Sequence, residues 1–205
     1  MNNKQAQLIK DVPDRVLIMN VWLTQGIVLL IAVVLTFFLF DKIRDFQSLF
    51  QWMDPNILFI GFLVGLVVVF IDLLMMRVLP PSYYDDGGIN ERIFSCLSYV
   101  HIFFLTAAVS ICEELLFRGA IQTYTTIWIA SAIFALVHYR YLFHPYLFIN
   151  VVLLSFLFGW IYEYTGNLLV TISMHFTIDF LLGLYIKWMS TKQKQDTQND
   201  YSESE

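Results

Sequence analysis

The sequence predicts an all-α, polytopic membrane helix bundle with about six transmembrane helices and with both termini in the cytoplasm. Three observations support this prediction. Of the 205 residues, 58% are hydrophobic and only 14% are charged, which is more apolar than a soluble domain of this size. The apolar residues are gathered in long runs separated by polar segments. Lys and Arg are concentrated in alternate connecting segments, which indicates the orientation.

The chain divides into four predicted segments that differ in polarity and in helix content. They are a polar cytoplasmic N-terminus (residues 1–15), two transmembrane helices with their loops (16–92), a four-helix core (93–189) and a disordered polar tail (190–205).

The first predicted helix is the apolar run over residues 16–40, which is longer than the apolar core of about 7 to 15 residues in a secretory signal. Residues 41–56 form a loop with aromatic side chains suited to the membrane interface. The second helix covers residues 57–79 and ends where Pro80 follows. Asp72 lies in this helix near its end, and we expect a structural role for it.

The core is predicted to contain four helices that are separated by turn residues. A polar break at residues 122–126, Pro145 and the Gly166-Asn167 pair mark the three turns. The helices are predicted over residues 93–124, 127–142, 146–164 and 168–189.

The distribution of Lys and Arg indicates a multi-pass protein of the cell membrane whose N-terminus is inside. The lipid bilayer is therefore an expected partner, and no basic patch indicates nucleic acid. On the outer side lie only Lys42 and Arg44. On the inner side lie Lys4, Lys10, Arg15, Arg77, Arg92, Arg140, Lys187, Lys192 and Lys194.

Three ionisable residues, Glu113, Glu114 and Arg118, stand within the long apolar run of the core. An unpaired charge at the middle of a membrane helix costs about 3 kcal/mol, so buried partners are expected. Glu114 and Arg118 are four residues apart with the acid first, which favours an ion pair on one helix face. Glu113 is rotated by about 100° and is available to another neighbour.

Helix lengths place further polar residues at the depth of Glu113. Glu113 comes about 12 residues before the turn at 122–126 and His138 about 12 residues after it, so both lie roughly 18 Å below that turn. His175, in the last predicted helix, lies at a similar depth, and Asp179 lies one helical turn deeper. Four polar positions from three helices therefore converge near the middle of the membrane.

Three motifs occur in order, each within an apolar helix: Glu113-Glu114-x-x-x-Arg118, Phe134-x-x-x-His138 and His175-x-x-x-Asp179. Together they resemble the motifs of the CPBP family of intramembrane endopeptidases, which includes CAAX proteases and is also called the Abi family. The resemblance covers about residues 100–185. Many relatives have Asn at the position of Asp179.

The resemblance implies hydrolysis of a peptide bond by an activated water, with a membrane-associated peptide or protein as substrate. By motif position, Glu113 and His138 would activate the water. His175 and Asp179 would stabilise the oxyanion or orient the scissile carbonyl. The remaining pair, Glu114 and Arg118, would hold the site in place.

The residue types leave a metal requirement open. Glu113, His138 and His175 match a zinc set of two His and one Glu with an open fourth position. No His-Glu-x-x-His helix is present, however. We favour a glutamate base without an obligatory metal.

The sequence is also compatible with two other classes of function. One is a non-catalytic membrane binding or immunity protein that retains the polar core. The other is a transporter of protons or small ions that uses the same carboxylates, although paired helices interrupted by Gly or Pro are absent from the sequence. No residue pattern indicates recognition of a prenyl group.

Overall fold

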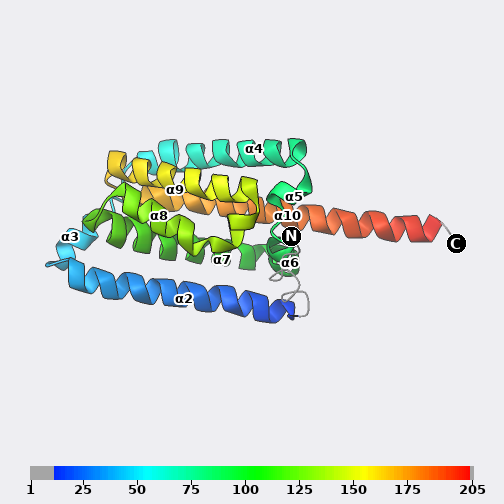
Figure 1. The fold of residues 1–205 in the computed structure, drawn as a ribbon, viewed down its shortest axis with the longest axis horizontal. Coiled ribbons are helices and arrows are strands. Elements are labelled where there is room, and N and C mark those ends of the chain that lie inside the picture. The colour runs from blue at the N-terminus through cyan, green and yellow to red at the C-terminus, as the bar shows by residue number, and fades with distance from the viewer. Residues whose placement is uncertain (1–11, 204–205) are drawn as a thin grey trace.

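A computed structural model describes residues 12–203, and every regular element within this range is helical (Figure 1). The predicted all-α class is therefore confirmed. Most of the predicted cytoplasmic N-terminus, together with Lys4 and Lys10, lies outside the described residues.

Among the described residues, five helical segments are long and apolar enough to cross a membrane, and α8 (Ile127–Val137) is a shorter apolar helix. The count is near the predicted number of about six. The long segments are α2 (Asp14–Leu39), η1 (Ile57–Phe62) with α4 (Leu63–Val78), α7 (Tyr99–Glu114) with η2 (Leu115–Gln122), α9 (Pro145–Thr165), and the first part of α10 (Leu168–Glu203). The connections contain α3 (Ile43–Gln47), α5 (Pro81–Tyr84), α6 (Ile89–Cys96) and η3 (Tyr139–Phe143).

Helix α10 occupies the centre of the bundle because it contacts η1, α4, α6, α7 and α9. Helix α2 packs against α7 and η2 on one side of the bundle, while α4 lies on the opposite side (Figure 1). The start of α2 and the end of α10 lie at the same end of the bundle, as an even number of passes along it requires (Figure 1). That this end is cytoplasmic stays a prediction.

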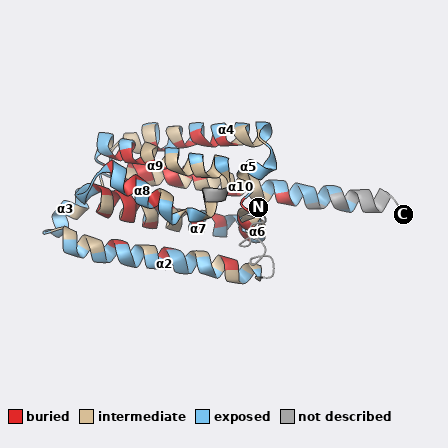
Figure 2. Cartoon of the chain, viewed as in Figure 1, coloured by how far each residue is buried: buried red, intermediate tan, exposed pale blue. Residues whose placement is uncertain are grey.

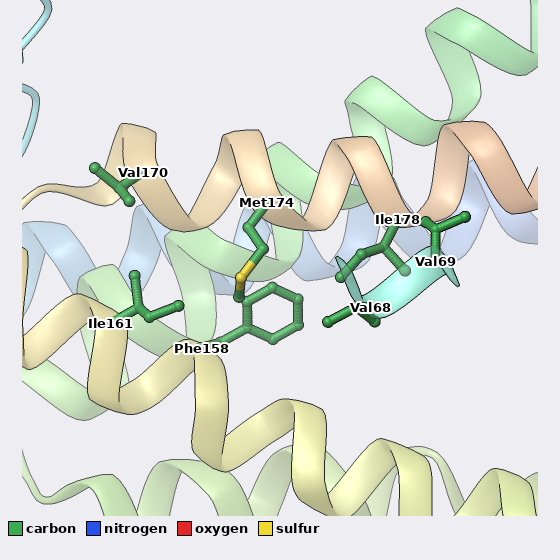
Figure 3. Close-up of a cluster of buried hydrophobic side chains, with 7 residues drawn as sticks. All are labelled: Val68, Val69, Phe158, Ile161, Val170, Met174 and Ile178. Carbon is green, nitrogen blue, oxygen red and sulfur yellow. The ribbon is translucent and has the colours of Figure 1, made fainter. Parts of the chain in front are cut away.

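Apolar side chains between α4, α9 and α10 form a buried core. In Figure 3, Phe158 of α9 and Met174 of α10 point toward each other, with Ile178 and Val68 beside them. Phe158 is 2% exposed and Met174 is fully enclosed. Burying each such side chain contributes about 1.5 to 3 kcal/mol in water, and in a membrane the same contacts act through close packing.

Many large apolar side chains are exposed on the outside of the bundle. Figure 2 shows that few residues of α2 are buried. Phe37 and Phe38 of α2 are 79% and 78% exposed, and Phe70 of α4 is 68% exposed. A continuous apolar surface of this kind is unfavourable in water and favourable against lipid. The chain is therefore a multi-pass integral membrane protein, as predicted.

The predicted start of the third helix, residue 93, is wrong. The structure has two helices in the predicted range 93–124, separated at Leu97. This residue is extended, with φ −80° and ψ 148°, and Ser98 begins the next helix. The Ser98 hydroxyl accepts a hydrogen bond from the backbone N–H of His101 at 3.2 Å. Such a cap satisfies a first-turn amide and so favours a new helix start.

Two further boundaries differ from the prediction. The fourth helix ends at Val137 rather than at residue 142, and a 3₁₀ turn continues it. Residues 190–203, predicted to be disordered, continue α10 as a helix. Extending an existing helix avoids the unfavourable nucleation step, and the Lys, Gln and Glu of this segment are good helix formers.

Gly61 allows η1 to approach α10 closely, and we predict that Gly61→Ala destabilises the fold. An added Cβ would lie 2.6 Å from the backbone oxygen of Val170, which cannot move aside without shifting α10. Such overpacking typically costs about 1 to 3 kcal/mol. Thermal unfolding in detergent would measure the loss. Gly26→Ala is the matched control because no atom lies within 4 Å of its added Cβ, and an undisturbed melting temperature for Gly61→Ala would contradict this packing.

Candidate active site

A cavity of about 340 Å³ lies inside the bundle and is lined by side chains of α2, α4, α6, α7, α8, η3, α9 and α10. Four of the six predicted site residues line it: Glu113, His138, His175 and Asp179. The other two, Glu114 and Arg118, are not part of the lining and are fully buried.

The predicted ion pair between Glu114 and Arg118 is present, with Arg118 Nε 3.6 Å from Glu114 Oε2 and neither side chain exposed. The guanidinium also donates to Ser155 Oγ at 3.2 Å and to Gln122 Oε1 at 3.3 Å. Its central carbon lies 5.5 Å from the ring centre of Phe134. Arg118 is thus held by groups from η2, α8 and α9.

Glu114 has a second partner that the sequence analysis did not predict. His175 Nδ1 donates to Glu114 Oε1 at 3.1 Å, so Glu114 joins the first motif to the third. The other ring nitrogen of His175, Nε2, lies 3.4 Å from Asp179 Oδ2. The i,i+4 spacing of His175 and Asp179 predicted that they share a helix face, and the structure confirms this. The imidazole stands between two carboxylates.

Glu113 faces the cavity and receives a hydrogen bond from α2, where Gln25 Nε2 donates to Glu113 Oε1 at 3.2 Å. Gln25 is 6% exposed, and its own amide oxygen is buried without a hydrogen-bond partner among the described residues. Glu113 and His138 were predicted to face each other. They line the same cavity, and no hydrogen bond joins them in the part of the chain that the structure describes.

His138 ends α8 and is oriented by Phe134, as the spacing of the second motif predicted. The two rings stack with their centres 4.5 Å apart and their planes at 28°. His138 Nδ1 lies 2.8 Å from the backbone oxygen of Phe134. Because a carbonyl oxygen only accepts, Nδ1 carries the proton and donates it. In the neutral ring, Nε2 then has a free lone pair.

Glu113, His138 and His175 do not form a zinc site in the observed arrangement. Within residues 12–203, no three His, Cys, Asp or Glu side chains are placed so that they could hold a metal ion. The nitrogens of His175 are directed at Glu114 and Asp179, and one oxygen of Glu113 accepts from Gln25. The donor set therefore does not fit a metal bound by these three residues.

Polar groups outside the six predicted site residues also line the cavity, among them Asp72, Asn150 and Arg140. Asp72, expected to be structural, accepts hydrogen bonds from Tyr146 and Asn150 of α9 and also faces the cavity. Asn150 and Ser155 interrupt an apolar helix, and this was a signal in the sequence. At one end of the cavity, Arg140 lies 3.2 Å from Asp86.

Asp86 lies outside the membrane-spanning segments, between α5 and α6. Burial raises the pKa of its carboxyl above the ordinary value, although Arg140 opposes this shift. The carboxyl also accepts from the backbone N–H of Ile89 at 3.0 Å. Asp86 therefore fixes both the start of α6 and the side chain of Arg140.

The fold and the cavity together define a class: a polytopic membrane protein with carboxylates and imidazoles enclosed between its helices. A family model described as type II CAAX prenyl endopeptidase Rce1-like matches residues 95–181, which include all six predicted site residues. The uncharacterized protein YpbD of Bacillus subtilis (strain 168) is 40% identical over 182 residues, covering 89% of this chain and 95% of the relative. No solved structure gives a significant match. The chain belongs to the Rce1-like family of CAAX-protease-type membrane proteins, as its three motifs indicated.

We predict that Arg118→Met destabilises the protein strongly, by about 3 to 5 kcal/mol, because it removes the fully buried guanidinium that pairs with Glu114. Unfolding in mixed detergent micelles would measure this loss. The double variant Glu114→Gln/Arg118→Met should lose less than the single one, since no buried charge is left unpaired. Arg77→Met, at an exposed position, serves as the control. Equal stability of Arg118→Met and the control would contradict the role of the pair.

Proposed function

We propose that the protein is an intramembrane endopeptidase that hydrolyses a peptide bond of a membrane-associated peptide or protein. One observation supports this most directly. One cavity between the helices is lined by Glu113 and His138, which are suited to activate water, and by His175 and Asp179. Membership in a CAAX-protease-type family agrees with the proposal.

Glu113 and His138 are the groups proposed to activate the water. Gln25 occupies only one carboxylate oxygen of Glu113, so the other is available to accept a hydrogen bond from water. The free Nε2 of His138 provides a second acceptor at the cavity. As the water oxygen bonds to the scissile carbonyl carbon, its proton passes to one of these groups. The same proton is then delivered to the leaving amine as the C–N bond breaks.

His175 is proposed to stabilise the negative charge that develops on the carbonyl oxygen. His175 Nδ1 donates to Glu114 Oε1, and Nε2 lies 3.4 Å from Asp179 Oδ2, so a protonated ring would have a carboxylate on each side. Glu114 fixes this ring from the side opposite Asp179, and Arg118 fixes Glu114. A cationic ring held in advance at the cavity wall favours an oxyanion without reorganisation.

We expect Glu113→Gln and His138→Ala to lower kcat/KM by about 10² to 10⁴, the usual contribution of a general base. Purified protein in nanodiscs would be assayed with a panel of fluorogenic membrane peptides. The panel includes a prenylated CAAX peptide because of the description that the family model carries. Melting temperatures should stay close to that of the parent protein.

The matched controls are Glu163→Gln and His101→Ala, which make similar changes at exposed positions outside the cavity lining. Both should retain parent activity. Unchanged turnover in Glu113→Gln would contradict the proposed chemistry. If no peptide is cleaved and the variants still bind partners as the parent does, a non-catalytic binding protein is the better description.

We further propose that hydrolysis needs no metal ion, since the donor groups do not form a ligand set in the observed arrangement. Activity should then change by less than about twofold after chelation and dialysis, whereas a metal site would lose activity when its ion is withdrawn. Elemental analysis of the dialysed protein verifies that the metal has been removed. Loss of activity that returns on addition of zinc would overturn this part of the proposal.

A further inference from the structure

Asp72 places a carboxylate on the cavity wall from outside the region that the family model matches. The residue is 4% exposed. Tyr146 Oη donates to Asp72 Oδ1 at 2.6 Å, and Asn150 Nδ2 donates to the same oxygen at 3.1 Å. Within the described chain, the second oxygen, Oδ2, has no hydrogen-bond partner, and it is not among the fully enclosed polar atoms. It is therefore open to the cavity.

Asp72 has no positively charged partner among the described side chains that line the cavity. Arg140 is the single Lys or Arg among the described lining residues, and it is already 3.2 Å from Asp86. Asp179 has His175 beside it at 3.4 Å. Asp72, in contrast, is held only by two neutral donors. A carboxylate within a membrane bundle is costly without a cationic partner, and the lining supplies none for this one.

The position of Asp72 indicates which part of a substrate would reach it. It lies about 9 Å before the end of α4, at the end of the bundle where α5 and α6 lie (Figure 1). Asn90 of α6 and Arg140 of η3 line the same cavity near that end. Because Glu113 and Asp72 line the same cavity, a peptide whose scissile bond lies at Glu113 and that runs toward this end of the bundle would pass Asp72.

We propose that Asp72 forms a subsite for a positively charged side chain, Lys or Arg, of the peptide substrate. This inference rests on the proposed endopeptidase function and adds to it a preference in substrate charge. Tyr146 and Asn150 act as positioning residues that direct the free oxygen into the cavity. The ammonium or guanidinium of the substrate would supply the cationic partner that Asp72 lacks within residues 12–203.

The test compares peptides that differ in one charge. N-acetylated fluorescent peptides carry one Lys, one Arg or one uncharged norleucine at successive positions on either side of the candidate scissile bond. Their Kd values are measured with Glu113→Gln protein in phosphatidylcholine nanodiscs, where neither lipid charge nor cleavage interferes. Lys or Arg at one position should bind about tenfold more tightly than norleucine, as expected for a desolvated charge pair.

Asp72→Asn, introduced into the same Glu113→Gln protein, should reduce this preference to within about twofold, because an amide oxygen still accepts from Tyr146 and Asn150 but carries no charge. Asp45→Asn is the control, since it removes an equal charge at an exposed position outside the cavity lining. It should leave the preference unchanged. Absence of a Lys or Arg preference at every position, or its persistence in Asp72→Asn, would overturn the inference.

Binding and cleavage separate this inference from the proposed function. In protein that retains Glu113, the same peptides give kcat/KM values. A charge preference in binding without any cleavage would contradict the endopeptidase and leave the cationic subsite standing. Cleavage that depends on Glu113 but shows no charge preference would contradict the subsite alone.

Discussion

The structure depends on one constraint: charges buried between membrane helices must find partners inside the protein. Arg118 and Glu114 are completely buried, and two of their polar contacts join separate helices. Arg118 reaches Ser155 of α9, and Glu114 reaches His175 of α10. Because an unpaired charge here would cost several kcal/mol, the relative positions of η2, α9 and α10 are determined by this network.

The network also explains why the cavity is polar where the predicted catalytic groups lie. Two consecutive acids at Glu113 and Glu114 point in different directions around α7, so one is used for architecture and the other faces the cavity. The short helix α8 ends at Val137, and the ring of the next residue, His138, donates to the Phe134 carbonyl in the last turn. Because α8 does not continue beyond this point, residues of η3 and α6 line this part of the cavity.

The two N-terminal helices contribute to the site although the family model covers only residues 95–181. Gln25 of α2 donates a hydrogen bond to Glu113, and Asp72 of α4 faces the cavity. Both helices expose many large apolar side chains, whereas Gln25 and Asp72 are polar residues buried on their inner sides. These helices therefore enclose the core and also supply two of the polar groups around it.

Helix number, helix position and same-helix pairs could be predicted from the sequence, because apolar length and i,i+4 spacing are local properties. The Glu114 and Arg118 pair and the stacking of Phe134 on His138 follow from spacing alone. Contacts between helices required the tertiary structure: His175 with Glu114, Gln25 with Glu113, and the opening of Asp72 to the cavity. The physical reason is that helices apolar on all sides carry little periodic signal for their rotation, and packing of the whole bundle decides which residues meet.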